Sequence, residues 1–242
     1  MVVPMTYAAD GQRRRGRPPR ISRDDIVDAA CELGIENLTM AAVAERLGVT
    51  HQSLYGWVQD RDELIDLVSD RLIRRLEIVP PADPADWRDS LRSYANGLRR
   101  LADEMPGFAA AGLGRFRMSD GFVKLNHAFV LMLTGVGFEP SFAQRVYDTL
   151  NTSLLGWIAR EEAVAVNRLQ AAGATSLEGM GAVVASLVAV SELRSPADER
   201  FEFLVHTFLA GLPNPPHRSA VSDPAMVVDL SEVLVTHSVR AP

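Results

Sequence analysis

The stretch from Leu38 to Leu64 reads LTMAAVAERLGVTHQSLYGWVQDRDEL. Thr39 can cap a short helix with apolar residues at helical spacing, and Gly48 ends it. Thr50 can cap a second, very short helix. Two short helices joined by a glycine-containing turn are typical of the helix-turn-helix motif, in which the second helix enters the major groove of DNA. The stretch therefore predicts a DNA-binding motif whose recognition helix is Thr50–Val58.

Two more helices flank this motif. Ser22 and Asp25 form a capping-box pattern ahead of a first helix. Asp60 can cap another helix after the motif, and the prolines between 80 and 84 break the chain that follows it. We therefore expect a three-helix DNA-binding domain with its connecting fourth helix over residues 22–78.

The remainder of the chain is also helical by its apolar periodicity. The expected helices are at 86–104, 120–136, 140–171, 177–192 and 196–211, with a short irregular piece near 107–115. Because strand alternation and hairpin signals are absent from the sequence, the fold class is all-α, with a larger helical domain over 85–212.

The two ends of the chain differ from this helical body. Residues 1–21 are expected to form a disordered basic arm, and its first twenty residues have a net charge of +4 against −6 for the whole chain. Residues 213–242 form a proline-rich tail, in which 226–235 can form a short packed helix. The arm's arginines, which we expect to contact DNA, are Arg13, Arg14, Arg15, Arg17 and Arg20.

Arg15-Gly16-Arg17-Pro18 in this arm resembles the core of an AT-hook. Extended arginine side chains favour the narrow minor groove of A·T-rich DNA. The alternative is a solvated tail that attracts phosphates without sequence preference. The sequence leaves both open.

Composition argues against several other classes of protein. No apolar run approaches the roughly 20 residues of a membrane span, and the N-terminus does not resemble a signal peptide. The single cysteine, Cys31, excludes an internal disulfide and suits a reducing cytoplasm. The five histidines are scattered, and no nucleophile or phosphate-binding loop appears. We therefore expect no enzyme activity, no catalytic residues, no metal and no cofactor.

The runs LTMAAVAERLGV (38–49) and SLYGWVQDRDEL (53–64) resemble the DNA-binding domain of the tetracycline-repressor (TetR) family. Segments 86–100, 137–163 and 199–212 resemble the ligand-binding and dimerisation domain of the branch nearest the tetracycline repressor itself. The resemblance covers most of residues 22–212. It implies a dimeric transcriptional repressor that a small-molecule effector releases from a palindromic operator.

Candidate DNA contacts follow from the motif and the resemblance. Gln52 can pair with adenine and His51 with guanine, whereas Tyr55 resembles the family tyrosine that meets a phosphate. Trp57 is expected in the core, on the inward stripe with Leu54 and Val58. The full set of candidates outside the arm is Thr39, Thr50, His51, Gln52, Ser53, Tyr55 and Arg61.

The resemblance also implies a pocket walled by the middle helices. Its candidate lining residues are Tyr94, Leu98, Leu113, Phe116, Asn126, Phe129, Leu133, Asn151 and Trp157. Asn96 and His127 are further candidates for orienting a ligand. Where the tetracycline repressor presents polar and metal-coordinating side chains, this chain has Leu76, Tyr94, Gly112 and Phe129, which argues against magnesium–tetracycline and favours a more apolar effector.

The long helices near 140–171 and 196–211 are expected to pair two subunits in a four-helix bundle. The second helix has an apolar face wider than a short helix usually buries within one subunit. The expected interface residues are Leu150, Leu154, Phe201, Leu204, Val205, Phe208 and Leu212. A dimer would place two recognition helices about one DNA turn apart, as a palindrome requires.

Two other readings of the sequence remain open. The AT-hook-like arm fits a ligand-independent, nucleoid-associated DNA-binding protein. The uncharged recognition helix and acidic body fit a small-molecule-binding or interaction protein that has lost DNA binding.

Overall fold

The computed structural model describes residues 21–114, 119–173 and 196–216, and side chains up to Ala165 within α8. All regular elements in these ranges are helical, which confirms the all-α class. The arginine arm, Phe116, the helix expected at 177–192 and the tail beyond Pro216 lie outside the described residues. The helices are α1 (Arg23–Leu33), α2 (Met40–Leu47), α3 (His51–Leu54), α4 (Arg61–Ile73), α5 (Trp87–Glu104), α6 (Phe108–Gly114), α7 (Asp120–Gly135), α8 (Pro140–Gly173) and α10 (Ala197–Ala210), with 3-10 turns at Ile35–Asn37 and Pro84–Asp86.

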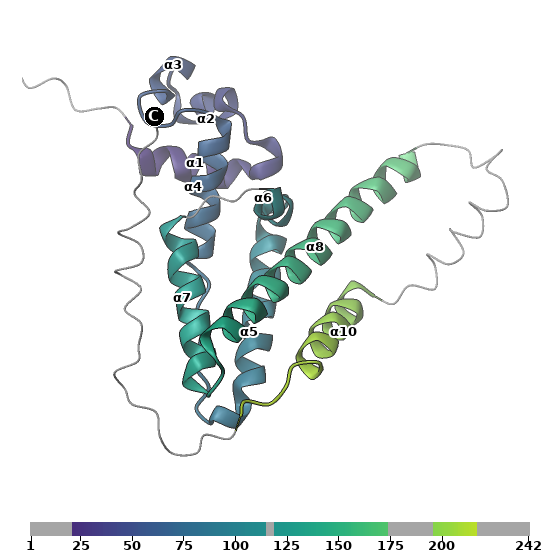
Figure 1. The fold of residues 1–242 in the computed structure, drawn as a ribbon. Coiled ribbons are helices and arrows are strands. Elements are labelled where there is room, and N and C mark those ends of the chain that lie inside the picture. Colours follow the sequence, from purple (N-terminus) through teal and green to yellow (C-terminus); the bar gives the residue numbers. More distant parts are fainter. Residues whose placement is uncertain (1–20, 115–118, 174–195, 217–242) are drawn as a thin grey trace, which may run out of the picture.

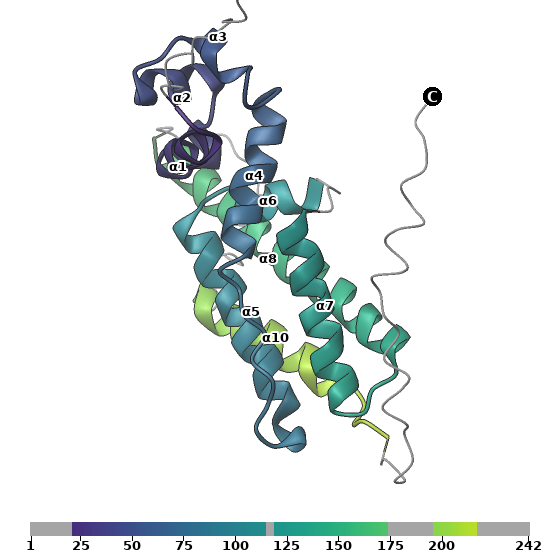
Figure 2. The ribbon, with the colours of Figure 1, turned by 90° about the vertical axis from the view of Figure 1, so that its left-hand side faces the viewer.

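Helices α1, α2 and α3 gather at one end of the molecule (Figures 1 and 2). The capping box predicted ahead of α1 is present, because Ser22 Oγ accepts from the Asp25 amide at 3.1 Å and the Ser22 amide donates to Asp25 Oδ2 at 2.8 Å. Gly48 ends α2 in the left-handed conformation, with φ of 63°, as the turn of the motif requires.

The recognition helix is shorter than predicted. It spans His51–Leu54, and the chain then turns, with the Trp57 amide donating to the Leu54 carbonyl at 2.8 Å. Gly56 lies within this turn, where its low helix propensity favours an early end. Val58 is buried as predicted, whereas Trp57 packs against the core with part of its ring exposed, so its placement in the core was only partly right.

Helix α4 connects the two parts of the molecule. Leu64 and Val68 are fully buried in the core, and α4 contacts both α1 and α7. The helix ends at Ile73, earlier than the apolar stripe to Leu76 suggested, and Leu76 follows in the linker.

Helices α5, α7, α8 and α10 form the body (Figure 1). The long helix α8 packs against α6 and α7 and crosses α5, while α10 packs on α5. The piece near 107–115 predicted as irregular is largely the helix α6, and its packing against α8 explains why such a short, glycine-rich segment is helical.

Four of the residues expected at a subunit interface lie instead in this chain's own core. Leu150, Leu154, Phe201 and Val205 are at most 1% exposed. The prediction was wrong for these residues because α10 buries its apolar stripe against α5 and α8; the rings of Phe201 and Trp157, for example, meet with centroids 5.2 Å apart. Side chains of intermediate exposure remain at Leu204, Phe208 and Leu212.

Arg88 at the start of α5 holds the end of α10. Its Nε donates to the Leu209 carbonyl at 3.1 Å and its Nη2 to the Leu212 carbonyl at 2.7 Å. Its Nη1 donates to Asn214 Oδ1 at 2.9 Å. These bonds satisfy carbonyls that a helix terminus leaves without intrahelical partners, and they fix where the chain leaves α10.

Candidate nucleic-acid interface and ligand cavity

The residues predicted to read DNA lie together on the exposed surface of α3. Thr50, His51, Gln52 and Ser53 are exposed, and so is Tyr55, at 52%. The Thr50 and Ser53 hydroxyls are 2.8 Å apart, and the rings of His51 and Tyr55 meet edge to face at 5.1 Å. These contacts order the surface while leaving the Gln52 amide group accessible.

Thr39, at the start of α2, is also exposed. Thr39 caps α2, with its Oγ1 accepting from the Ala42 amide at 3.1 Å. A helix N-terminus with accessible amides favours a phosphate, so the geometry suits the predicted backbone contact.

Arg61 has a structural role that the sequence did not indicate. Its Nε donates to the Leu38 carbonyl at 2.6 Å, and its Nη2 donates to the Ile35 carbonyl at 3.2 Å. The guanidinium thereby ties the start of α4 to the segment that precedes α2. A phosphate contact by Arg61 stays a prediction, and it would have to be made while these two bonds hold.

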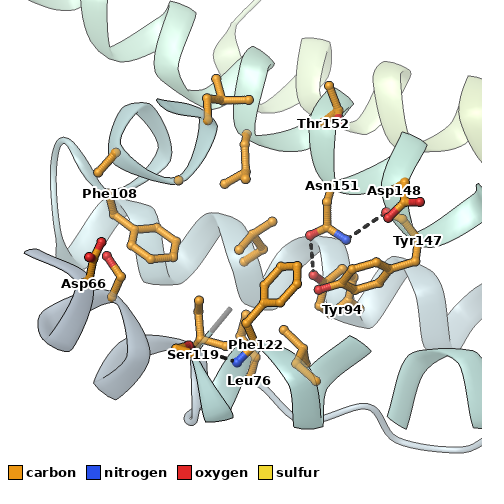
Figure 3. Close-up of a pocket in the computed structure, with 18 residues that line it drawn as sticks. Asp66, Leu76, Tyr94, Phe108, Ser119, Phe122, Tyr147, Asp148, Asn151 and Thr152 are labelled. Carbon is orange, nitrogen blue, oxygen red and sulfur yellow. Dashed lines mark hydrogen bonds between the residues drawn. The ribbon is translucent and has the colours of Figure 1, made fainter. Parts of the chain in front are cut away.

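A cavity of about 380 Å³ opens between the helices of the body (Figure 3). Most of its wall is apolar, with aromatic rings from α5, α6, α7 and α8. Its lining residues are Asp66, Ser69, Ile73, Leu76, Tyr94, Leu98, Phe108, Ala111, Gly112, Leu113, Ser119, Phe122, Leu125, Tyr147, Asp148, Asn151, Thr152 and Leu155.

The predicted pocket residues divide into two groups. Tyr94, Leu98, Leu113 and Asn151 line the cavity, together with the family-aligned positions Leu76 and Gly112. The other predicted residues in the described ranges do not. Phe129 and Leu133 are fully buried behind the wall. Trp157 packs toward α10 and lines a separate cleft. Asn126 does not line the cavity, and neither do the further candidates Asn96 and His127.

Phe129 supports the wall from behind, since its ring meets those of Tyr94 and Tyr147 at 5.5 and 5.0 Å. These predicted residues miss the cavity because of how their helices are rotated about their axes. An apolar residue on the right helix can face either the cavity or the core, and apolar periodicity does not distinguish these two directions.

Sequence reasoning missed the contribution of α4. Asp66, Ser69 and Ile73 line the cavity, although the whole helix was assigned to the DNA-binding domain. Their spacing of three and four residues places them on one face of α4, next to the stripe of Leu64 and Val68. Asp66 and Ser69, two polar residues beside this apolar stripe, are the sequence signal from which the contribution of α4 could have been predicted.

A short polar network lies at one end of the cavity. The Tyr94 hydroxyl donates to Asn151 Oδ1 at 2.6 Å, and Asn151 Nδ2 donates to the Tyr147 carbonyl at 2.8 Å (Figure 3). Burial raises the pKa of Tyr94 well above its usual value, with Tyr147 adding to the effect. Burial also raises the pKa of Tyr147, with a further contribution from Asp148. Both phenols therefore stay neutral at physiological pH.

Asp70 joins α4 to the start of α7 beside the cavity. Its Oδ1 accepts from the Gly121 amide at 2.7 Å, and its Oδ2 accepts from Arg74 Nε at 2.6 Å. Burial raises the pKa of Asp70, but hydrogen bonds from Ser119, Arg74 and Gly121 outweigh burial, so the net pKa is lowered. A β-carbon at Gly121 would lie 2.7 Å from Asp70 Oδ1, so only glycine allows this close approach.

Within the described residues, no group of three or more His, Cys, Asp or Glu side chains is placed to hold a metal ion. None of the described helices is long and apolar enough to cross a membrane.

Comparison with known proteins agrees with this geometry. No protein-family model matches the chain. The HTH-type transcriptional repressor Rv1353c of Mycobacterium tuberculosis is 25% identical over 179 residues, which cover 69% of this chain and 68% of that protein. An HTH-type transcriptional regulator of Saccharopolyspora erythraea is 33% identical over 147 residues, which cover 59% of this chain and 62% of that protein. The crystal structure of the Streptomyces coelicolor TetR family protein ActR in complex with actinorhodin matches with a TM-score of 0.63 and 25% identity, over 79% of this chain and 94% of that one.

The helix-turn-helix surface, the all-α fold and these similarities define a DNA-binding transcriptional regulator. In sequence and in fold the chain resembles the TetR family of such regulators.

The buried tyrosines make the stability of the protein sensitive to alkaline pH. A raised pKa in the folded state means that stability is intact below about pH 10 and is lost as pH rises toward the folded pKa. Tyr147→Phe should flatten this loss by up to about 1.4 kcal/mol per pH unit. Urea unfolding at several pH values between neutral and alkaline measures how the free energy of unfolding depends on pH.

Tyr55→Phe is the matched control, because Tyr55 is 52% exposed. Its pH slope should equal that of the unaltered protein. Equal slopes for Tyr147→Phe and the unaltered protein would contradict the burial argument.

Proposed function

We propose that this protein is a dimeric repressor that binds a palindromic operator through α3 and leaves it when a small, largely apolar effector fills the cavity. Repressor relatives such as Rv1353c support repression. The complex of ActR with actinorhodin supports a bound ligand for a protein of this fold.

The observation that carries the proposal is the position of α4. Leu64 and Val68 pack into the core that α1 and α2 share, while Asp66, Ser69 and Ile73 line the cavity. Arg61, at the first turn of the same helix, bonds the carbonyls just before α2. A ligand that shifts α4 would therefore shift the helix-turn-helix, and a difference in ligand affinity between the two arrangements would release DNA.

The lining of the cavity restricts the chemistry of the effector. Rings of Tyr94, Phe108, Phe122 and Tyr147 favour a flat aromatic or polycyclic molecule. Asn151 offers a polar group to orient it, as do Ser119 and Thr152 at other points of the wall. A volume of about 380 Å³ is typical of a small-molecule site. The nearby carboxylates of Asp66 and Asp148 disfavour an anionic ligand.

The subunit interface that we propose differs from the set expected from sequence. With Phe201 and Val205 buried, the outward face of α10 has Phe203, which is 72% exposed, beside the partly exposed Leu204 and Phe208. A large exposed aromatic ring next to partly exposed apolar neighbours favours association with a second copy. Dimerisation through this face would pair the two recognition surfaces.

Selection of bound DNA from a random pool, with footprinting of the selected site, tests the proposal. A palindromic footprint that an aromatic compound abolishes would support it. Protection without a discrete palindrome would favour a nucleoid-associated protein instead, and absence of salt-dependent DNA binding would favour a protein that has lost this role.

Gln52→Ala should weaken operator binding by about 1–3 kcal/mol, roughly fivefold to 150-fold in Kd, because a bidentate contact is lost. It should also relax specificity at one base position. Binding titrations on the operator and on its single-base variants measure both effects. Gln144→Ala on α8, where the amide bonds Asp148 at 3.0 Å, is the control and should bind normally. Unchanged specificity in Gln52→Ala would exclude it as a base reader.

Phe203→Glu should weaken the dimer by about tenfold or more in Kd, because it places a charge in the centre of the proposed apolar contact. Sedimentation equilibrium measures the change. Leu131→Glu on α7, where the side chain is 45% exposed, should leave the dimer intact. A Phe203→Glu protein that dimerises normally would place the interface elsewhere.

Ala111→Phe should reduce affinity for the releasing compound by about tenfold or more, because the added ring occupies the cavity, and operator affinity should be unchanged. Ala110→Phe, one residue earlier on the exposed side of α6, is the matched control. Calorimetric titration with the releasing compound distinguishes them. Equal affinities for the two variants would show that the compound binds outside the cavity.

A further inference from the structure

A second groove lies between the end of α4, the linker that follows it and the first half of α7. Its volume is about 630 Å³. Val79 in its wall is 59% exposed, which is unusual for a large aliphatic side chain. The apolar residues that form it are Ile73, Leu76, Ile78, Val79, Pro80 and Leu125.

Only one layer of side chains separates this groove from the cavity. Ile73, Leu76 and Leu125 line both spaces. Whatever covers the groove therefore packs against residues that also wall the cavity.

The chain beyond the described residues starts within reach of the groove. Arg88 bonds the Leu212 carbonyl and Asn214, and Pro215 lies against Gly137, where a β-carbon would be 3.6 Å from the Cβ of Pro215. Gly137 lies two residues beyond the end of α7, and a β-carbon there would also lie 3.8 Å from the Pro216 carbonyl oxygen. The described chain therefore ends beside the helix whose first half lines the groove.

The length of the chain matches this distance. Residues 217–223 can extend over about 23 Å. The helix rise from Gly137 back to Lys124 is about 20 Å. A segment that begins at residue 224 can therefore lie along the groove.

The sequence of that segment suits an apolar groove. Asp223 followed by Pro224 is a typical helix start, and the apolar residues that come next recur at helical spacing. They form one continuous stripe of Met226, Val227, Leu230, Val233 and Leu234. An amphipathic helix this short needs a partner surface, because isolated helices below about 12–15 residues are marginal in water.

Charge is complementary as well. Asp229 borders the stripe and Glu232 lies farther round the helix, while Lys124 and Arg74 line the groove. Lys124 forms no ion pair with any residue that the structure describes, whereas Arg74 pairs with Asp70 and, at 3.8 Å, with Asp120. The groove wall also contains the acidic Glu77. An acidic helix is therefore favoured at the Lys124 side of the groove.

We propose that residues 224–235 form a helix that docks its apolar stripe into this groove of the same chain. The docked helix covers Val79 and Leu76 in the groove wall.

Disulfide trapping in the full chain tests docking. In a Cys31→Ala background, Val79→Cys is combined with Leu230→Cys on the stripe or, as control, with Val228→Cys on the opposite side of the helix. Because a disulfide needs Cα atoms about 5.5–6 Å apart, the stripe pair should close within one chain about tenfold faster than the control pair. Mass spectrometry and non-reducing electrophoresis measure the rates. Closure between two chains would assign the groove to a second copy, and equal rates would overturn the proposal.

Hydrogen exchange tests docking without relying on one pair of introduced cysteines. Leu230→Asp with Leu234→Asp should speed exchange about tenfold in the peptides that cover 76–80 and 121–128. Val228→Asp with Val235→Asp is the matched control and should leave exchange unchanged. If exchange is equal in both double variants, the tail does not dock, and this result stands whether or not an effector is found.

Discussion

The rest of the structure depends on helix α4, which packs into the core on one side and faces the cavity on the other. Helix α4 packs Leu64 and Val68 into the core shared with α1 and α2, and it turns Asp66, Ser69 and Ile73 toward the cavity. A helix that is close-packed on one side cannot adjust to a ligand on the other without moving as a unit. The contact of Asp70 with the Gly121 amide reinforces this, because it fixes the end of α4 to α7. The coupling between ligand and DNA that we propose is therefore a mechanical property of α4.

The cavity combines apolar walls with a few oriented polar groups. The Tyr94 hydroxyl bonds Asn151, and Asn151 in turn bonds the backbone carbonyl of Tyr147. The rings of both tyrosines pack on Phe129. Burying these polar groups is favourable only because they satisfy one another. Such a wall keeps its shape when empty, which favours a flat, rigid ligand over a flexible charged one.

Much of the DNA-binding half was predictable because its signals are local. The caps of Ser22 and Thr39 and the left-handed Gly48 each depend on neighbours within a few residues in sequence. The length of α3 was not predictable in this way, because Thr50–Val58 has helical apolar spacing whether or not the chain turns at Tyr55. Arg61 was read as a phosphate contact since its carbonyl partners, at Leu38 and Ile35, are more than twenty residues away in sequence.

The sequence by itself determined the all-α class, the position of the helix-turn-helix and the boundaries of most long helices, because helical periodicity and capping are short-range properties. Only the tertiary structure decided which side of each helix faces the core, the cavity or solvent. Phe201 and Phe203 show the difference: they lie two residues apart on α10, yet one is fully buried and the other is 72% exposed. That outcome depends on how α10 rests on α5 and α8, and packing between helices distant in sequence is what periodicity alone does not specify.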